Sequence, residues 1–457
     1  MKDDLQGKRQ TELFEKAKDY ALQYMALVRG RRVFPDDDAV EGLHAFRERL
    51  PEDPAEPGEV LELLHRHGSP ATVAQTGGRY FGFVNGGITP AALAARWLAD
   101  TWDQNAALYV ISPTAAVLEE VCEGWLVDLL GLPDGTAAGL VAGTSTATLT
   151  GLAAGRDGLP RRQGWDAGSR GLFGAPEIRV VLGEQAHSSV FKALSILGLG
   201  RDRVVRVPVD AQGRMRAEDL PALDERTLLI LQAGNVSTGA FDPFEPLCAS
   251  ARKAGSWVHV DGAFGLWAAA SPARRRLTKG IELADSWSAD AHKTLNAPYD
   301  NGIVFCRDPE ALARAMQMSG SYIVYSGKRD GTMYAPDMSR RARGVDLWAT
   351  LKGLGRRGVA DLVDGLCDKA AAFADSLRKE GFTILNDVVF NQVLVSCGKA
   401  ELTRSTLEKV QASGECWCGG TTWNGEPAIR ISVCGHETTE EDISRSVAAF
   451  VKARASA

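Results

Sequence analysis

The chain has 457 residues, of which 45% are hydrophobic and 24% charged, so its composition is that of a globular protein and excludes a small binding module or a disordered tail. Its 52 Lys and Arg residues and 58 Asp and Glu residues give a formal net charge of -6, and no long basic run is present. We therefore expect no nucleic-acid partner.

The N-terminus lacks the apolar core of a signal peptide, and no segment approaches the ~20 consecutive apolar residues that cross a bilayer. We expect a cytoplasmic protein without a membrane partner. Its eight scattered cysteines are then expected to be reduced thiols.

Residues 1–75 are predicted to form an N-terminal helical segment separate from the main domain. Apolar residues recur every three or four positions from Arg9 to Arg29, and Gly30 follows as a stop signal. This amphipathic helix is expected to fold over a partner subunit or over its own chain. Two more helices are predicted, at 91–102 and 113–130.

Residues 76–340 are predicted to form a large domain in which strands alternate with helices. The predicted strands are 178–182, 204–207, 228–231, 257–260 and 302–305. Such alternation indicates a mostly parallel sheet, and ligands of such sheets bind beyond the carboxyl ends of the strands.

Residues 341–457 are predicted to form a smaller α/β domain. A long helix reaches Lys379, and strands are expected at 382–385, 393–396 and 428–433, with a helix near Leu407. The last helix opens at Thr438 with the spacing of a capping box.

Two residues near the predicted sheet suggest chemistry. Lys293 lies in a polar run directly before the apolar strand 302–305. A lone Lys is most often a surface cation, but burial near other cationic groups frees the amine to form an imine with a carbonyl group. Asp261 ends the strand 257–260 and is either a turn residue or the partner of a protonated pyridine nitrogen.

Two turns are further candidates for ligand binding. Residues 143–148 form a small hydroxyl-rich turn between a strand and a helix, where an anion can bind, although many such turns look alike. His187 follows the strand 178–182. It is either a structural hydrogen-bonding residue or a ring that stacks on a flat cofactor.

Taken in order and at their spacings, these motifs resemble the pyridoxal-phosphate-dependent group II decarboxylase family, which includes aromatic-amino-acid and glutamate decarboxylases. The motifs are Gly143-Thr144-Ser145, Ala186-His187-Ser188-Ser189, His259-Val260-Asp261-Gly262-Ala263, His292-Lys293 and, less specifically, Tyr80-Phe81-Gly82 and Ile429-Arg430-Ile431. The resemblance runs from about residue 70 to the C-terminus. It implies the α/β aspartate aminotransferase-like fold (fold type I), with a mostly parallel seven-stranded sheet flanked by helices.

The resemblance implies pyridoxal 5'-phosphate as the cofactor. By position, Lys293 matches the Schiff-base lysine, Asp261 the partner of the pyridine nitrogen, and His187 the residue that stacks on the ring. The remaining implied contacts are the phosphate with Gly143, Thr144, Ser145 and His292, the far face of the ring with Ala263, the ring hydroxyl with Asn235, and the substrate with Arg430 and Phe83. Arg430 would pair with a substrate carboxylate.

The implied reaction is decarboxylation of an L-amino acid to an amine and CO₂ by a homodimer with active sites near the interface. We expect an apolar or aromatic substrate, because no second Arg or Lys stands out near Phe83 to pair with an acidic one. In relatives a Tyr on a mobile loop returns the proton. Tyr334 matches best by position, with Tyr322 and Tyr325 as alternatives.

The chain departs from the family pattern at two positions. Asp290-Ala291 stands where many relatives have Asn-Pro, and Asn235 stands where relatives often carry Thr.

Other functions remain open from the sequence. Oxidative deamination to an aldehyde, transamination and carbon–carbon lyase chemistry share the same cofactor pocket. A serine hydrolase is a distant alternative, because Gly143-Thr144-Ser145-Thr146-Ala147 nearly spells a nucleophile elbow. We expect no metal site, because the pairs His65/His67 and Cys416/Cys418 each lack a second pair at zinc spacing. A non-enzymatic scaffold would be expected to lack Lys293 or Asp261.

Overall fold

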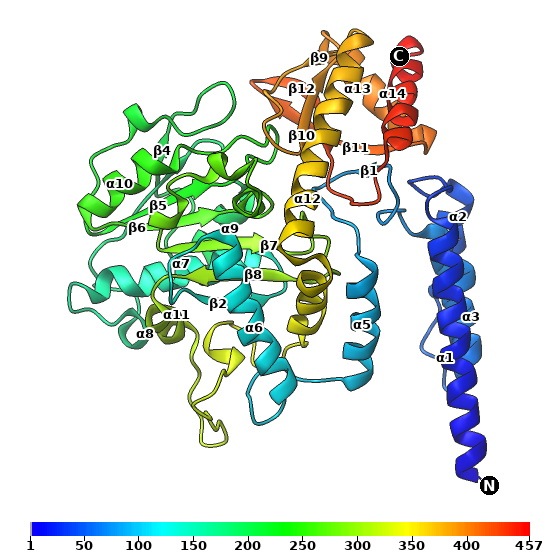
Figure 1. The fold of residues 1–457 in the computed structure, drawn as a ribbon, viewed down its shortest axis with the longest axis horizontal. Coiled ribbons are helices and arrows are strands. Elements are labelled where there is room, and N and C mark those ends of the chain that lie inside the picture. Colours follow the sequence, from blue (N-terminus) through cyan, green and yellow to red (C-terminus); the bar gives the residue numbers. More distant parts are fainter. Residues whose placement is uncertain (1) are drawn as a thin grey trace.

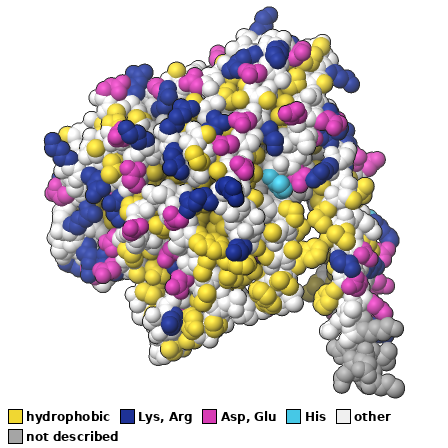
Figure 2. All heavy atoms as spheres, viewed as in Figure 1, with side chains coloured by type: hydrophobic (Ala, Val, Ile, Leu, Met, Phe, Trp, Pro, Cys, Tyr) yellow, Lys and Arg dark blue, Asp and Glu magenta, His cyan; other side chains and the backbone are white. Residues whose placement is uncertain are grey.

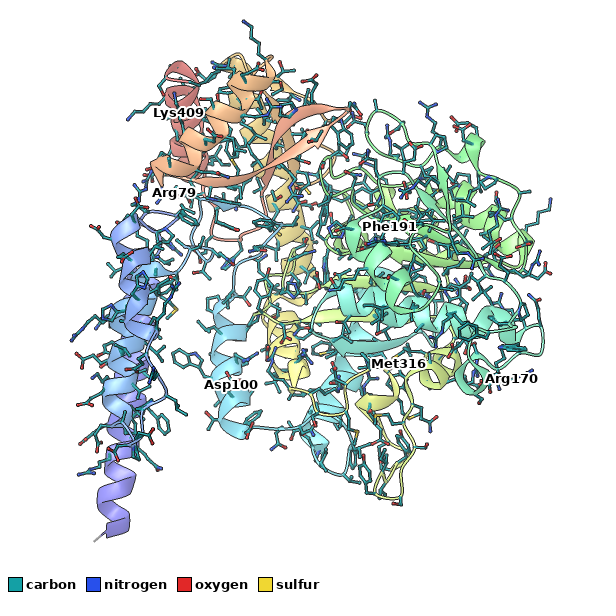
Figure 3. The ribbon with its side chains drawn as sticks, turned by 180° about the vertical axis from the view of Figure 1, so that it is seen from behind. Arg79, Asp100, Arg170, Phe191, Met316 and Lys409 are labelled. Atoms are coloured by element: carbon teal, nitrogen blue, oxygen red, sulfur yellow. The ribbon has the colours of Figure 1, made fainter. Side chains whose placement is uncertain are left out.

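The computed structural model describes residues 2–457. At its N-terminal end, helices α1 (Lys2–Leu27) and α3 (Pro57–Leu63) lie side by side and form an arm at one side of the molecule (Figure 1). The side chain of Arg79 fastens the base of this arm to the C-terminal domain (Figure 3). It donates to the carbonyls of Arg29 and Arg31 at 3.0 and 3.1 Å and pairs with Glu415 at 2.9 Å.

The large domain is built on a seven-stranded sheet with the order β2-β8-β7-β6-β5-β3-β4. Only β8 runs antiparallel to its neighbours. The predicted mostly parallel sheet is therefore confirmed. The strands are β2 (Ala137–Val141), β3 (Arg179–Gly183), β4 (Val204–Val207), β5 (Thr227–Gln232), β6 (Trp257–Asp261), β7 (Ser286–Asp290) and β8 (Gly302–Cys306). The polar strand β7 was not expected.

Helices cover both faces of this sheet, which explains why its strands read as continuous apolar runs. Alternate residues of β5 belong to two different cores, with Leu229 and Leu231 on one face and Leu228 and Ile230 on the other. One face packs against α7 (Thr144–Arg161), α9 (Ser188–Ile196) and α11 (Pro309–Met316). The other packs against α6 (Pro113–Leu130), α10 (Phe244–Ala254) and α12 (Arg343–Lys379).

The C-terminal domain contains a five-stranded sheet with the order β1-β11-β12-β10-β9. Its strands are β1 (Tyr80–Phe81), β9 (Thr383–Ile384), β10 (Gln392–Ser396), β11 (Trp417–Trp423) and β12 (Glu426–Ser432), and its helices are α13 (Ala400–Ser413) and α14 (Glu440–Ala455). Strand β1 lies outside the range 341–457 that the sequence assigned to this domain. It belongs to this sheet because Tyr80 and Phe81 pair with β11, and the strand order places it at one edge.

The capping box of α14 is formed by Thr439 and Asp442, one residue later than the predicted Thr438. Among the residues that the structure describes, no helix is long and apolar enough to span a bilayer.

The two faces of the C-terminal sheet differ. Cys418 and Ile429 face the helices and join a core with Phe373 and Phe450. Arg430 pairs in register with Gly419, two residues beyond Trp417, so Trp417 and Arg430 share the opposite face. This second face lies against the large domain, where Arg430 donates to the carbonyl of Val236.

A buried polar cluster on β6 and β7 makes stability depend on pH. The Nδ1 atom of His259 lies 2.9 Å from the hydroxyl of Ser286, which also accepts a hydrogen bond from the indole of Trp257. Burial lowers the pKa of His259 to about 3, whereas an unfolded His titrates near pH 6.5. Between these pH values only the unfolded chain binds the proton, so the free energy of unfolding falls as the pH falls.

We predict that His259→Gln makes the protein less sensitive to acid. From pH 7 to pH 5 the wild type should lose about 2 kcal/mol of unfolding free energy through this one group, and the variant should not. Urea denaturation at both pH values measures the difference. The exposed His44 provides the control, because His44→Gln should leave the acid sensitivity unchanged. Equal acid sensitivity in the wild type and His259→Gln would contradict the prediction.

Candidate active site

The carboxyl ends of β2, β3, β5, β6 and β7 meet at one edge of the large sheet (Figure 1). The candidate residues follow these ends directly, namely Gly143 after β2, His187 after β3, Asn235 after β5, Asp261 at the end of β6 and Lys293 after β7. The topology therefore brings motifs that are up to 150 residues apart in the chain to one edge of the sheet, as we expected from the sequence.

Lys293 lies in the turn that follows β7 and is only partly exposed. Its Nζ atom lies 3.2 Å from Oδ2 of the buried Asp290. The other carboxylate oxygen of Asp290 accepts a hydrogen bond from the backbone N–H of Thr144 at 2.7 Å. Asp290, noted in the sequence only as a departure from the family pattern, thus joins the lysine to the N-terminus of α7.

Asp261, His187 and Lys293 lie close enough together for their charges to act on the pKa values of Asp261 and His187. Burial raises the pKa of the Asp261 carboxyl, whereas His187 and Lys293 oppose this rise. Burial also lowers the pKa of His187, with Asp261 acting in the opposite direction. Oδ1 of Asp261 accepts a hydrogen bond from the N–H of Ala263 at 3.2 Å. Burial therefore disfavours the charged form of Asp261 unless a cationic group faces its carboxylate.

His187 also has the structural role that the sequence left open. It is the N-cap of α9, and its Nδ1 atom accepts a hydrogen bond from the N–H of Ser189 at 3.3 Å. His187 is exposed to solvent in part, and protein atoms near Asp261, Lys293 and Arg430 surround the rest of the side chain. Stacking on a cofactor ring stays a prediction.

The turn at Gly143 forms a cradle at the N-terminus of α7. A Cβ atom on Gly143 would lie 3.2 Å from Cε1 of His292, so the missing side chain keeps this space open. The hydroxyl of Thr144 is buried and has no hydrogen-bond partner among the described residues. Ser145 is exposed. An unpartnered hydroxyl at a helix N-terminus suits a phosphate group.

His292 contacts the same cradle as a neutral imidazole. Its Nδ1 atom accepts a hydrogen bond from the N–H of Asn301 at 3.1 Å, and burial lowers the pKa of the ring. The proton therefore sits on Nε2, 3.5 Å from Asp290. A serine hydrolase would need Asp261 to orient this ring, and Asn301 does so instead.

Arg430 reaches the site from β12 of the C-terminal domain. One guanidinium nitrogen donates to the carbonyl of Val236 at 3.3 Å, and its Nε atom is buried without a partner among the described residues. Burial lowers the pKa of Arg430. The side-chain oxygen of Asn235 accepts from Ser237 and Thr238 and so closes its own turn. Its contact with a ring hydroxyl stays a prediction.

Aromatic side chains cluster around Trp417 on the face of the C-terminal sheet that also carries Arg430. Phe83 is 62% exposed, has a φ of 52°, and stacks on Trp417 with 5.5 Å between ring centroids. Tyr80 also stacks on Trp417, at 5.3 Å. The next residue, Val84, has a φ of 60°, which a β-branched residue rarely adopts outside functional sites. Trp417 was not predicted from the sequence, although the alternating buried thiols of Cys416 and Cys418 indicate a strand with Trp417 on its other face.

Tyr334 is not brought to this site within its own chain. It packs beneath β2, where its backbone carbonyl closely approaches Gly139 and its ring lies 4.9 Å from the guanidinium of Arg329. Arg329 in turn is held by the carboxylate of Glu123 at 2.8 Å. These contacts hold Tyr334 beside β2. Gly143 follows the carboxyl end of that strand, so Tyr334 lies away from the cradle.

A family model described as the pyridoxal-dependent decarboxylase conserved domain matches residues 45–397. The chain belongs to this family. The predicted resemblance, and with it the pyridoxal phosphate cofactor and carboxy-lyase class, is therefore confirmed.

Individual relatives of this decarboxylase have different substrates. This chain is 26% identical to the aromatic-L-amino-acid decarboxylase of Bacillus atrophaeus, and the match covers 96% of this chain and 94% of the relative. It is 31% identical to the aspartate 1-decarboxylase of Aliivibrio fischeri, over 54% of this chain and 48% of the relative. A crystal structure of Oryza sativa TDC with PLP and tryptamine is similar, with a TM-score of 0.89, 22% identity, and coverage of 98% and 97% of the two chains. The last likeness confirms the fold.

The residues of this decarboxylase fit pyridoxal phosphate. The cradle at Gly143 and the unpartnered hydroxyl of Thr144 suit its phosphate, and the amine of Lys293 suits its aldehyde. The buried carboxylate of Asp261 suits the protonated nitrogen of its ring.

Proposed function

We propose that this decarboxylase converts an apolar or aromatic L-amino acid to its amine and CO₂, with Lys293 as the residue that binds the cofactor covalently. The observation that carries the proposal is the group formed by Lys293, Asp261 and His187 at the carboxyl ends of three strands, beside the cradle of α7. The bound cofactor supplies an aromatic ring that accepts the electrons left when the carboxylate departs.

Each residue of the site then has a defined role toward the cofactor or the substrate. Asp261 keeps the ring nitrogen protonated, Thr144 and His292 hold the phosphate, and His187 covers one face of the ring. Arg430 donates to the carbonyl of Val236, and its Nε atom is buried without a partner among the described residues. It pairs with the substrate carboxylate and fixes the orientation of the bond to be broken.

The substrate class is supported by the surface beside Arg430. Phe83 and Tyr80 stack on Trp417, on the face of the C-terminal sheet that also carries Arg430. Flat apolar rings favour a substrate with an aromatic or apolar side chain. An acidic side chain would need a second cation in the same place.

The test is a panel of L-amino acids with CO₂, amine, aldehyde and ammonia measured together. We expect CO₂ and amine in equal amounts, with the highest kcat/KM for aromatic substrates. Faster turnover of aspartate or glutamate would reject the proposed substrate class. Aldehyde with ammonia as the main products would reject the proposed reaction.

We infer that Tyr322, rather than Tyr334, is the better candidate for returning the proton. Tyr322 is 74% exposed on the segment between α11 and Arg329, whereas Tyr334 packs beneath β2. We predict that Tyr322→Phe shifts product from amine toward aldehyde, because the hydroxyl that protonates the α-carbon is lost and dioxygen reacts instead. Tyr334→Phe is the matched control and should keep the wild-type amine-to-aldehyde ratio. The opposite pattern would restore Tyr334 to the mechanism.

A homodimer is also part of the proposal. Apolar side chains are exposed on the arm and on the neighbouring helix α5 (Pro90–Trp102), and Figure 2 shows hydrophobic side chains gathered in that region. These exposed side chains are Phe14, Leu22, Met25, Leu27, Trp97, Leu98 and Trp102. Such a surface marks a subunit interface. Light scattering should give twice the chain mass at micromolar concentration, and an active monomer would reject the dimer.

We further infer a cytoplasmic location. All eight cysteines are free thiols in the described structure, and seven of them are buried. Such thiols are typical of a reducing compartment.

A further inference from the structure

Asn296, three residues after Lys293, lies where three segments of the chain meet. It is fully buried and has a φ of 57°, a left-handed conformation that Asn tolerates better than most residues. Its backbone N–H donates to the carbonyl of Lys293 at 3.0 Å and closes the turn after the lysine.

The side chain of Asn296 connects this turn to the C-terminal domain. Its Nδ2 atom donates to the carbonyls of Thr294 and Cys434, both at 2.9 Å, and lies 3.2 Å from the carbonyl of Lys293. Its Oδ1 atom accepts a hydrogen bond from the N–H of His436 at 2.9 Å. One amide therefore binds the lysine turn on one side and the segment after β12 on the other.

The Oδ1 atom of Asn296 also contacts the segment that follows Phe83. It accepts a hydrogen bond from the N–H of Gly87 at 2.6 Å. The adjacent Gly86 donates to the carbonyl of His292 at 3.3 Å, and a Cβ atom on Gly86 would lie 2.1 Å from the carbonyl oxygen of Lys293. The segment that begins at Phe83 thus packs backbone against backbone on the lysine, and Asn296 fixes that contact.

We propose that Asn296 is a positioning residue that holds the backbone of Lys293 at a fixed place relative to Gly86–Gly87 and the C-terminal domain. The proposal rests on the proposed covalent role of Lys293. This position requires a side chain that has a donor on one side and an acceptor on the other. An amide has both, because its Nδ2 atom faces three carbonyl oxygens and its Oδ1 atom faces two backbone N–H groups. A carboxylate of the same shape would place an oxygen against those carbonyls.

Asn296→Asp tests this role with little change in volume. Asn386→Asp is the matched control, because Asn386 is also buried, donates to the carbonyls of Thr238 and Gln392, and accepts from the N–H of Leu394. The readouts are the rate at which pyridoxal phosphate becomes attached to Lys293, trapped with borohydride, and the affinity for inorganic phosphate in competition. Thermal unfolding of each variant is measured in parallel.

We expect Asn296→Asp to slow attachment at Lys293 by about tenfold or more, because small displacements of a reacting group are costly. Phosphate affinity should stay within about twofold of the wild type, since the cradle of α7 is intact. Asn386→Asp should leave both quantities unchanged. Wild-type attachment in Asn296→Asp, or an equal loss in both variants, would overturn the positioning role.

Gly86→Ala gives an independent test if Asn296→Asp does not fold. Its added methyl group pushes on the carbonyl of Lys293 from the other side, and the same slow attachment is expected. Attachment at the wild-type rate would overturn the role. A wild-type protein that traps no cofactor would instead overturn the proposed function itself.

Discussion

Lys293→Ala is expected to lower decarboxylation by about a thousandfold or more, which corresponds to about 4 kcal/mol of transition-state stabilisation. The reason is that the amine of Lys293, whose Nζ atom lies 3.2 Å from Asp290, is the group that we propose to bind the cofactor covalently. The measurement is CO₂ release from an aromatic L-amino acid with pyridoxal phosphate in excess.

Lys369→Ala is the control for this experiment. Lys369 is also partly buried, and burial lowers its pKa, but it lies on α12 in the C-terminal part of the chain. The control should keep wild-type activity. Substantial activity in Lys293→Ala would mean that another residue carries the cofactor.

Asp261→Asn is expected to have the second largest effect. The substitution keeps the shape of a buried side chain but removes the negative charge that we propose to face the ring nitrogen of the cofactor. Breaking a buried charge pair costs about 3–5 kcal/mol, so kcat should fall by roughly two to four orders of magnitude. The cofactor should still attach to Lys293, because the lysine and the phosphate cradle are intact.

The same variant has a predicted effect on pH dependence. Asp261 raises the pKa of His187 against the effect of burial, so its neutralisation should lower the pKa of His187 further. An acid limb of kcat/KM that belongs to His187 should then move to lower pH. A variant with unchanged kcat and an unchanged acid limb would remove Asp261 from the mechanism.

The strands of the large sheet were predictable where both faces are apolar. Strands β5 and β6 are buried on both sides, so they read as continuous hydrophobic runs. Strand β7 was missed because it carries Ser286 and Ser288, whose hydroxyls meet the indole of Trp257 and the hydroxyl of Thr148. Those partners come from distant segments, and only the folded chain makes a polar strand suitable for the core.

The residues of the site likewise fall into those that were predictable from the sequence and those that were not. Residues such as Asp261 and His187 follow strands directly, so the rule for the carboxyl ends of parallel strands locates them from the sequence. Asn296 and Trp417 contact segments that are distant in the sequence, as when Asn296 meets Cys434 across 138 positions of the chain. Tyr334 was chosen by its distance along the chain from Arg340, but the ion pair of Arg329 with Glu123 decides where that segment lies.

The most direct test of the assignment of Lys293 is borohydride reduction of the wild-type protein loaded with pyridoxal phosphate, followed by peptide mass mapping. We predict one reduced cofactor per chain, located on the peptide that contains His292 and Lys293, with loss of the yellow colour. A reduced adduct on a different lysine, or no adduct at all, would contradict the assignment of this edge of the sheet as the active site.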